Sequence, residues 1–426
     1  MNVKTLHDAF LKCGSKVDID SRFIKKDSIF FAIKGENFDG NNFAIEALKN
    51  GSQKAVIDSN DLKFKGIKNI IRVKDSLKTL QNLASYHRKK NKSKVIALTG
   101  SNGKTTSKEL INSVLGKKYK TISTSGNYNN HIGVPLSLLE IKDDTEFSII
   151  ELGANNFGEI NFLTKMVQPD YGYITNFGKA HLEGFINLDG VIKAKTELYN
   201  WIIENNKTLI LNLDDNNQKK FQSYSNFSFG SKKSSNFVFE RLVGENINVK
   251  ESENIYKSNM YGDYNYSNIC SAIAIGLKFD VDFKLIQNAI SSYIPKNNRS
   301  QIIDKYEKHI ILDAYNANPT SVEFAMESFS KLIGSKAIII GDMLELGDSS
   351  LQEHKLIVEF SNNLNIDKCY FIGNDFYKVK TNNKKVFFFK AKDDFYNNIS
   401  KISEKNILIK GSRGMKMEEI IQKKIK

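Results

Sequence analysis

The sequence has 426 residues, enough for two to four domains at about 100–200 residues per domain. Hydrophobic residues make up 40% and charged residues 26% of the chain, which excludes a disordered polymer and a small scaffold held together by disulfides. The formal net charge of +14 is compatible with a nucleic-acid partner, an anionic small substrate or simply a lysine-rich proteome, so the charge alone decides nothing.

The cysteines and the apolar runs indicate the compartment. Cys13, Cys270 and Cys369 lie far apart in the sequence, which argues against a CxxC metal or redox site and is typical of a reducing compartment. The first residues lack the apolar stretch of a secretory signal, and no run approaches the ~20 apolar residues of a membrane-spanning helix. We therefore expect a cytoplasmic protein without membrane insertion.

The first predicted domain, residues 1–85, alternates short apolar runs with helical stretches. Ser28–Ile33 (SIFFAI) predicts a buried strand, because turn-forming and charged residues bound a short apolar run. Phe43–Lys49 predicts a helix that the following Asn-Gly pair ends. The basic stretch Tyr86–Lys94 predicts a solvated helix end at a domain boundary.

The second predicted domain, residues 86–295, opens with a strand at Lys94–Leu98, a glycine-rich loop and an amphipathic helix at Ser107–Leu115. Further strands are expected at Phe147–Glu151, Tyr171–Thr175 and Thr208–Asn212. Strands that alternate with helical stretches indicate a mainly parallel sheet covered on both faces.

The third predicted domain, residues 296–426, has the same alternation. Its strands are expected at His309–Leu312, Lys336–Ile340, Lys368–Ile372, Val386–Phe389 and Ile407–Lys410. Its helices are expected at Ser321–Leu332, Gln352–Asn362, Asp393–Ser403 and Met415–Ile425. This pattern is typical of a small Rossmann-like domain, so the predicted fold class is α/β with three domains.

The most informative motif is the phosphate loop, residues 99–106 (TGSNGKTT), between the strand and the helix that open the second domain. Backbone N–H groups of a glycine-rich turn can converge on phosphate oxygens, and the helix N-terminus adds its positive dipole end. Lys104 would contact the β- and γ-phosphates, and Thr105 would offer its hydroxyl to Mg²⁺. The alternative is a tight glycine turn without a ligand. The Gly-Lys-Thr sequence between a strand and a helix favours the phosphate loop over this alternative. The expected ATP contacts are Gly100, Ser101, Asn102, Gly103, Lys104, Thr105 and Thr106.

Two polar side chains follow predicted strand ends. Glu151 ends one strand, and a carboxylate at the carboxyl end of a parallel strand lies in the ligand crevice, where it can hold Mg²⁺. A lone Glu is more often merely exposed, but the neighbouring phosphate loop favours the functional interpretation. His181 follows another strand end, and there a ligand and a structural histidine stay equally open.

The phosphate loop has two residues between its glycines instead of the usual four. This shortened form resembles the ATP loop of the Mur ligases and of the folylpolyglutamate synthases, which join an amine to a carboxylate with ATP. Lys195, taken alone a solvated lysine, lies in an AKTE segment that resembles the one in which Mur ligases carry a carbamylated lysine. The resemblance implies two Mg²⁺ ions held by Thr105, Glu151, His181 and Lys195, with Lys104, His181 and Lys195 as catalytic residues.

Segments along the whole chain resemble the Mur ligases that add D-alanyl-D-alanine to UDP-N-acetylmuramoyl-tripeptide. They are Asp20–Arg22, Phe30–Gly35, Asn127–Pro135, Glu151–Asn156, Tyr264–Asn268 (with Tyr where the family has His), Asp313–Pro319 (DAYNANP), Gly341–Gly347 with His354, and Lys410–Gly414. The family often has His where Asn41 stands, so that position is left unassigned. The resemblance implies that ATP is bound by Asn268, Arg299, Asp313 and Asn316. It implies substrate contacts by Ser21, Arg22, Asn129, Asn130, His131, Asn318, Lys410, Ser412 and Arg413.

The predicted function is therefore an ATP-dependent amide ligase of peptidoglycan precursor synthesis, a monomer that works through an acyl phosphate and binds no nucleic acid. Another Mur-type ligase or a folylpolyglutamate synthase, each adding a single amino acid, is the nearest alternative; the DAYNANP segment and the uridine-type first domain weigh against it. A P-loop ATPase acting on nucleic acid is permitted by the charge, although no RNP-like motif or zinc module is present. A non-catalytic nucleotide-binding partner is the third. Whether the acceptor peptide carries diaminopimelate or lysine stays open.

Overall fold

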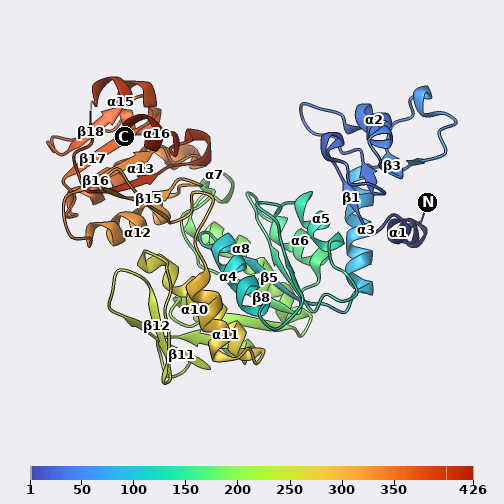
Figure 1. Cartoon of the computed structure of the whole chain (residues 1–426), viewed down its shortest axis with the longest axis horizontal. Coiled ribbons are helices and arrows are strands. Elements are labelled where there is room, and N and C mark those ends of the chain that lie inside the picture. Colours follow the sequence, from blue (N-terminus) through green and yellow to red (C-terminus); the bar gives the residue numbers. More distant parts are fainter. Residues whose placement is uncertain (1, 400, 426) are drawn as a thin grey trace.

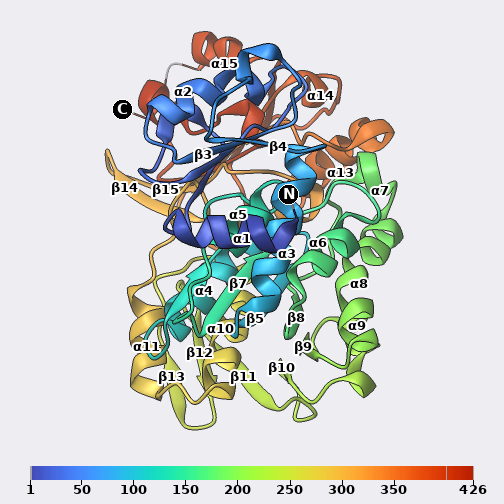
Figure 2. The ribbon, with the colours of Figure 1, turned by 90° about the vertical axis from the view of Figure 1, so that its right-hand side faces the viewer.

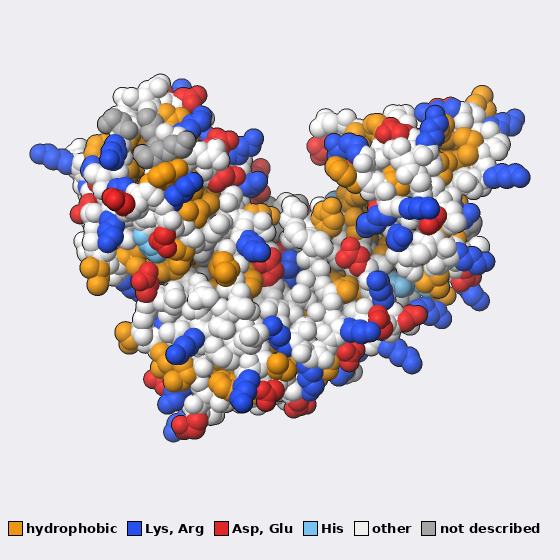
Figure 3. Space-filling view, viewed as in Figure 1, with side chains coloured by type: hydrophobic (Ala, Val, Ile, Leu, Met, Phe, Trp, Pro, Cys, Tyr) orange, Lys and Arg blue, Asp and Glu red, His pale blue; other side chains and the backbone are white. Residues whose placement is uncertain are grey.

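Three separate β-sheets, each flanked by helices, follow one another along the chain (Figure 1). This computed structural model describes residues 2–399 and 401–425. The N-terminal and C-terminal domains stand as two lobes on the central domain, and the space-filling view shows a hollow between them (Figure 3). The predicted α/β class with three domains is confirmed, whereas the residue limits given for each domain stay a prediction.

The first sheet has four parallel strands in the order β1-β2-β3-β4. The strands are β1 (Val17–Asp18), β2 (Ile29–Phe31), β3 (Lys54–Ile57) and β4 (Ile70–Arg72), and the helices are α1 (Val3–Lys12), α2 (Ala44–Lys49) and α3 (Ser76–Lys90). The predicted strand at Ser28–Ile33 is β2, whose three side chains are buried as an apolar run requires. The predicted helix at Phe43–Lys49 is α2, with Phe43 as its N-cap.

Helix α3 connects the first sheet to the central domain, and α1 packs across α3 (Figure 2). The prediction that Tyr86–Lys94 is a solvated helix end was wrong for three of its residues. His87, Arg88 and Ser93 are only 5%, 8% and 2% exposed. The Arg88 guanidinium donates to the carbonyl oxygen of Val167 and pairs with Asp170 at 2.9 Å. Because a guanidinium enters a protein interior only with such partners, these contacts anchor the end of α3 in the central domain.

The central sheet has nine strands in the order β13-β12-β11-β10-β9-β8-β5-β7-β6. They are β5 (Lys94–Thr99), β6 (Thr121–Ser123), β7 (Phe147–Glu151), β8 (Tyr171–Ile174), β9 (Thr208–Asn212), β10 (Ser228–Gly230), β11 (Phe237–Leu242), β12 (Asn248–Glu251) and β13 (Asn254–Tyr256). The pairs from β6 to β11 are parallel, as predicted, and the four expected strands are β5, β7, β8 and β9. The antiparallel pairs β11-β12 and β12-β13 at one edge were not predicted.

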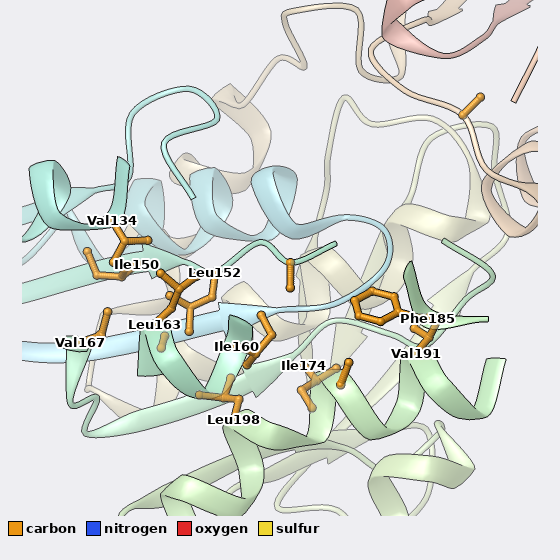
Figure 4. Close-up of a cluster of buried hydrophobic side chains, with 14 of the residues drawn as sticks. Val134, Ile150, Leu152, Ile160, Leu163, Val167, Ile174, Phe185, Val191 and Leu198 are labelled. Atoms are coloured by element: carbon orange, nitrogen blue, oxygen red, sulfur yellow. The ribbon is translucent and has the colours of Figure 1, made fainter. Parts of the chain in front are cut away.

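Helices cover both faces of this sheet. They are α4 (Lys104–Leu115), α5 (Gly133–Leu139), α6 (Glu159–Val167), α7 (Leu182–Phe185), α8 (Leu188–Glu204), α9 (Asn216–Lys219), α10 (Tyr266–Lys278) and α11 (Phe283–Ser292). On one face Ile150 of β7, Leu163 of α6 and Leu198 of α8 belong to a single buried cluster (Figure 4). This packing fixes β8, β5 and β7 side by side, so the loops after their carboxyl ends converge.

The third sheet has the order β14-β15-β19-β16-β17-β18, parallel except for the antiparallel edge strand β14. Its strands are β14 (Gln301–Lys305), β15 (Lys308–Asp313), β16 (Lys336–Gly341), β17 (Lys368–Ile372), β18 (Val386–Phe389) and β19 (Asn406–Lys410). Its helices are α12 (Pro319–Ser330), α13 (Ser350–Asn362), α14 (Asn374–Tyr377), α15 (Lys392–Asn398) and α16 (Glu419–Lys424). All five predicted strands are present within one residue at each end.

Two predicted helices of this domain are shorter in the structure. The helix expected at Asp393–Ser403 is α15 and ends at Asn398; Ser400 lies outside the described residues. The helix expected at Met415–Ile425 begins only at Glu419, because a 3₁₀ turn at Arg413–Met415 and a left-handed Lys416 precede it. Within the part of the chain that the structure describes, no helix is long and apolar enough to cross a bilayer.

Candidate active site

A cavity of about 900 Å³ lies where the carboxyl ends of β5, β7 and β8 face the C-terminal domain. Most of the predicted site residues line it, from segments far apart in the sequence. They are Ser101, Asn102, Gly103, Lys104, Thr105, Thr106, Asn129, Asn130, Glu151, His181, Asn268, Arg299, Asp313, Asn316, Asn318, Lys410, Ser412 and Arg413. This convergence makes the cavity the candidate active site.

The phosphate loop turns directly from β5 into α4. Gly100 and Gly103 have φ angles of 147° and 77°, which side chains rarely adopt. A Cβ atom at Gly100 would lie 2.0 Å from Oγ1 of Thr175, and one at Gly103 would lie 2.5 Å from Oδ1 of Asn268. Only glycine therefore fits both positions, and the loop backbone stays free to approach a ligand.

Lys104 begins α4 and folds back over the loop. Its Nζ donates to the carbonyl oxygens of Gly100 at 2.6 Å and Ser101 at 3.2 Å. Burial lowers the pKa of Lys104, while the nearby charge of Glu151 opposes that shift. An ammonium held only by loop carbonyls can turn to phosphate oxygens, which offer it stronger, charge-assisted bonds.

Glu151, at the end of β7, is the centre of a buried polar network. Its Oε2 accepts from the hydroxyl of Thr105 at 3.0 Å, and its Oε1 accepts from Nδ2 of Asn129 at 2.7 Å. Nζ of Lys108 lies 3.7 Å from the same Oε2 and donates to the carbonyl oxygen of Thr124 at 2.6 Å. The network thus joins the phosphate loop, β7 and the loop after β6.

Lys108 is a residue of this network that the sequence analysis missed. It is 1% exposed, although lysine is rarely buried completely in proteins. It lies one helical turn after Lys104 on α4, and residues four apart share a helix face. That spacing was the available signal, but nothing in the sequence indicates that this face is turned toward Glu151.

His181 meets a carboxylate of the C-terminal domain. Its Nδ1 lies 2.6 Å from Oε2 of Glu345, which also lines the cavity and was not predicted as a site residue. The close approach of His181 lowers the pKa of Glu345 against the effect of burial. The contact gives His181 a structural place between the two domains, and its role as a ligand stays a prediction.

Lys195 lies on α8 and is 1% exposed, whereas the residue taken alone was expected in solvent. Its Nζ has no hydrogen-bond partner among the described residues and lies 5.2 Å from the ring centroid of Phe185. Burial, reinforced by the charge of Lys104, lowers the pKa of Lys195 to about 7. Lys195 does not line the cavity, and its amine is largely neutral above this pH.

Asn268 was expected to bind ATP, and its amide also holds two helices together. Its Oδ1 accepts from the hydroxyl of Ser107 on α4 at 2.9 Å, and its Nδ2 donates to Oδ1 of Asn265 at 3.0 Å. Asn268 lies on α10. The side chain therefore ties α10 to the phosphate-loop helix and fixes this wall of the cavity.

The C-terminal domain supplies the opposite wall. The Arg299 guanidinium lies 3.5 Å from the ring centroid of Tyr315, a cation–π contact that fixes a flat surface beside the cavity. Nζ of Lys410 lies 2.6 Å from Oδ2 of Asp313 and donates to the carbonyl oxygen of Asn316 at 3.1 Å. These groups lie around the end of β15, at the carboxyl edge of the third sheet.

Direct hydrogen bonds join the two walls. Nδ2 of Asn318, the N-cap of α12, donates to Oδ1 of Asn102 in the phosphate loop at 2.8 Å. Lys179 pairs with Glu353 at 2.7 Å in a second contact between the central and C-terminal domains. The phosphate loop is thus already in contact with the DAYNANP segment.

Five predicted residues lie outside the cavity lining. Gly100 and Lys195 are behind it, and His131 is exposed on the loop before α5. Ser21 and Arg22 belong to the first domain, where Arg22 pairs with Asp20 at 2.6 Å and holds the pKa of that carboxyl at about 2. Asn41, left unassigned, is buried and bonds to two aspartates of its own domain.

Across residues 2–399 and 401–425, no three His, Cys, Asp or Glu side chains gather closely enough to hold a metal ion on their own. The oxygen donors present are the Thr105 hydroxyl and the Glu151 carboxylate, 3.0 Å apart. Mg²⁺ is commonly bound through one or two carboxylates together with substrate phosphates. The residues therefore fit Mg²⁺ that arrives with a nucleotide better than a site built from protein groups alone.

Comparisons with known proteins agree on one relationship. Models described as "Mur ligase family, catalytic domain", "Mur ligase middle domain" and "Mur ligase, glutamate ligase domain" match residues 15–88, 98–276 and 298–413. UDP-N-acetylmuramoyl-tripeptide–D-alanyl-D-alanine ligase of Buchnera aphidicola subsp. Baizongia pistaciae is 34% identical, over 100% of this chain and 95% of that protein.

Two solved structures are similar over nearly the whole chain. A crystal structure of MurF from Acinetobacter baumannii has a TM-score of 0.84 at 30% identity and covers 96% of this chain and 92% of that one. MurF ligase from Thermotoga maritima in complex with ADP has a TM-score of 0.82 at 25% identity and covers 96% of both chains.

Proposed function

Since this chain belongs to the Mur ligase family, we propose that it is an ATP-dependent ligase that adds D-alanyl-D-alanine to UDP-N-acetylmuramoyl-tripeptide in peptidoglycan precursor synthesis. Full-length relatives carry that name, and a related structure contains ADP. The observation that carries the proposal is the shared cavity, in which the phosphate loop meets the DAYNANP and KGSRG segments of the C-terminal domain.

The reaction has two steps. A carboxylate oxygen of the tripeptide attacks the γ-phosphorus of ATP, so that ADP leaves and an acyl phosphate forms. The amine of D-alanyl-D-alanine then attacks the acyl carbon, the amide bond forms, the amine loses a proton, and phosphate leaves with the bridging oxygen. The phosphate acceptor is the substrate itself, so the protein needs no nucleophile and acts by positioning and by neutralising charge.

Lys104 and the loop backbone would bind the phosphates. The Lys104 ammonium exchanges loop carbonyls for β- and γ-phosphate oxygens, and the N–H groups at the start of α4 add the positive end of the helix dipole. Asn268, Arg299, Asp313 and Asn316 would surround the rest of the nucleotide along the same cavity. Excluding water from this cavity protects the acyl phosphate from hydrolysis.

Thr105, Glu151, His181 and Lys195 would hold Mg²⁺. When bound, Mg²⁺ neutralises the charge that spreads over the oxygens of the transferring phosphoryl group. Lys195 fits this role only after modification, because an amine is a poor Mg²⁺ ligand. Its amine, buried without a partner and with a pKa of about 7, would add to the carbon of CO₂ and release a proton, which leaves a carbamate with oxygen donors.

The remaining predicted residues would bind the two substrates. Ser21 and Arg22 would contact the uridine diphosphate part; Asn129, Asn130 and His131 the muramoyl peptide; and Asn318, Lys410, Ser412 and Arg413 the incoming dipeptide. Support comes from the cavity, which Asn129 and Asn130 line on one side and the C-terminal residues on the other. A cytoplasmic location fits the three cysteines, all buried and free, and action as a monomer stays a prediction.

The test is an acceptor panel. Phosphate release with ATP, Mg²⁺ and UDP-N-acetylmuramoyl-tripeptide is measured with D-alanyl-D-alanine, meso-diaminopimelate, lysine or glutamate as the only amine. We expect release that requires D-alanyl-D-alanine and is abolished by Lys104→Ala. Release with a single amino acid would instead identify another Mur-type or folylpolyglutamate-type ligase, and hydrolysis stimulated by nucleic acid would identify an ATPase. Diaminopimelate- and lysine-containing tripeptides, compared as substrates, would decide the third residue of the peptide.

A further inference from the structure

The segment between β6 and α5 brings three asparagines to the candidate active site. Asn127, Asn129 and Asn130 line the cavity, and we call residues 124–130 the asparagine loop. The loop contains neither helix nor strand, and residues 125–128 are exposed. A segment without a backbone ladder is held in place by the groups that bond to it from outside. The position of the three asparagines therefore depends on the anchors of this loop.

The second half of the asparagine loop is anchored to β7 and α5. The carbonyl oxygen of Asn129 accepts from the backbone N–H of Gly153 at 2.8 Å, and its Nδ2 donates to Oε1 of Glu151 at 2.7 Å. Oδ1 of Asn130 accepts from the N–H of Gly133, the first residue of α5, at 2.9 Å. These bonds fix the loop at its end, close to the start of α5.

A buried lysine anchors the first half. Nζ of Lys108 on α4 donates to the carbonyl oxygens of Thr124 at 2.6 Å and Gly126 at 3.4 Å. The same nitrogen lies 3.7 Å from Oε2 of Glu151. An ammonium has three N–H donors, so the three acceptors around it can use all of them. Because Lys108 is 1% exposed, these groups rather than water balance its charge.

The carbonyl oxygen of Thr124 needs such a donor, because the residue is 1% exposed. Its N–H donates to the carbonyl oxygen of Ile149 at 3.0 Å, and its hydroxyl accepts from the N–H of Glu151 at 3.0 Å. A methionine in place of Lys108 would fill the space but take the donor away from this carbonyl oxygen. A buried acceptor that loses its donor destabilises its position, so the exposed residues that follow would shift toward water.

Lys108 also relates the loop to the nucleotide side of the cavity. It lies one helical turn after Lys104 on α4, and the Thr105 hydroxyl on the same helix donates to Glu151 at 3.0 Å. One helix thus joins the residues expected to bind phosphate to the residue that holds the loop. Lys108 does not line the cavity itself, so it can act on a substrate only through the loop.

We propose that Lys108 is a positioning residue for the peptide substrate: by holding the carbonyl groups of Thr124 and Gly126, it sets the place of the three asparagines relative to the phosphate loop. The inference rests on the proposed function in one respect, the contact of this loop with the muramoyl peptide. Its consequence is a division of effects. Loss of Lys108 weakens the use of the peptide substrate, whereas the contacts of Lys104 and the loop backbone with the nucleotide persist.

Lys336 of the C-terminal domain is a matched control. It lies on β16, is 3% exposed and donates to the carbonyl oxygens of Leu332 at 2.8 Å and Gly334 at 3.2 Å. It does not line the cavity. Lys108→Met and Lys336→Met each remove a buried ammonium that holds two carbonyl groups, so they separate placement of the asparagine loop from a general loss of stability.

The experiment measures the KM for UDP-N-acetylmuramoyl-tripeptide and the KM for ATP, each with the other substrates and Mg²⁺ saturating. We expect Lys108→Met to raise the KM for the UDP-tripeptide about 10-fold or more, since a misplacement of about 1 Å can cost about 100-fold. The KM for ATP should stay within about twofold, because the nucleotide contacts are unchanged. Lys336→Met is expected to leave both values unchanged.

The failures are distinguishable. If Lys108→Met leaves the KM for the UDP-tripeptide unchanged, or raises the KM for ATP equally, the inference is overturned and the proposed function stands. An equal effect of Lys336→Met would mean a general loss of stability and would also overturn it. If the original chain releases no phosphate in response to the UDP-tripeptide, the proposed function fails instead.

A second measurement follows the loop without any substrate. Hydrogen exchange, read by mass spectrometry, compares peptides that cover residues 124–130 and 104–115 in the original chain and in Lys108→Met. We expect exchange to become about 10-fold faster or more in the loop and to change little in α4. Equal exchange in the loop of both proteins would overturn the inference. Lys108→Gln, which is shorter and uncharged, replaces Lys108→Met in both experiments if the latter does not fold.

Discussion

Lys108→Met removes one charge from the buried network around Glu151. Nζ of Lys108 lies 3.7 Å from Oε2 of Glu151, and each side chain is 2% exposed. With an effective dielectric constant of about 20, two charges at this distance attract by about 4 kcal/mol. Breaking a buried pair usually costs about 3–5 kcal/mol, and Glu151 keeps its bonds from Thr105 and Asn129, so we expect a loss of about 3 kcal/mol.

The stability of the central domain can be followed separately. Trp201 is the only tryptophan of the chain and lies on α8, so its fluorescence during urea unfolding reports on this domain. Lys108→Met, Glu151→Gln and the double variant form a cycle. We expect the double variant to lose less stability than the sum of the single losses, by about 1–3 kcal/mol, as contacting buried residues do.

Additive losses, within about 0.5 kcal/mol, would refute the reasoning, because they would mean that the two charges do not interact in the folded protein. Lys120→Met is the matched control. Lys120 pairs with Asp144 at 2.9 Å on the surface of the same domain, and both side chains are more than half exposed. We expect the unfolding curve of this variant to match that of the original chain.

Three further changes have defined outcomes. Gly103→Ala should lower stability by about 1–2 kcal/mol, the cost of a left-handed side-chain residue, and weaken ADP binding in calorimetry because the methyl group displaces Asn268; unchanged ADP affinity would contradict this. The pKa of Lys195 is about 7 in the folded chain and 10.5, its ordinary value, in the unfolded chain. Between pH 7 and pH 10.5 the unfolded chain therefore binds more protons than the folded chain. The loss of folding stability caused by burying Lys195 is thus complete below pH 7 and disappears as the pH rises toward 10.5. Lys195→Met should therefore raise the melting temperature at pH 7 more than at pH 10 in bicarbonate-free buffer, and an equal gain at both would contradict the lowered pKa. Arg88→Met should lower the free energy of unfolding by about 3 kcal/mol, since it removes a buried guanidinium and leaves carbonyl groups without a hydrogen-bond donor. Lys207→Met removes a more exposed partner of the same Asp170 carboxylate and should cost much less. Equal losses would be inconsistent with the burial of Arg88.

The sequence predicted those parts of the fold that local patterns determine. The strand, glycine-rich loop and helix over residues 94–115 could be predicted from a short apolar run followed by the sequence Gly-Lys-Thr, which is typical of a phosphate loop. The five predicted strands of the C-terminal domain are apolar runs. The parallel sheet buries most of β15, β16, β17 and β19, whereas the edge strand β18 is only partly buried. Strands β12 and β13 at the edge of the central sheet were missed because they have only four and three residues, and β12 is largely polar, so neither periodicity nor composition marks them.

The site was predicted where a residue type alone indicates chemistry. Lys104 and Glu151, which line the cavity, could be chosen as candidates because a phosphate loop and a carboxylate at a strand end are recognisable in the sequence. Lys108 and Glu345 were missed because their importance comes from partners far along the chain, Glu151 and His181, and from how domains meet. Arg88 was assigned to solvent for the same reason, since two of the carbonyl oxygens that accept its hydrogen bonds, those of Val167 and Gln168, lie at the end of α6, far along the chain.

The central claim is that the γ-phosphoryl group passes to the carboxylate of the bound peptide. The most direct test uses UDP-N-acetylmuramoyl-tripeptide labelled with oxygen-18 in the reacting carboxylate, ATP, Mg²⁺ and D-alanyl-D-alanine, and mass analysis of the phosphate released. An acyl phosphate requires one labelled oxygen in each phosphate, because the bridging oxygen leaves with it. Phosphate without label, or pyrophosphate and AMP as products, would contradict the mechanism.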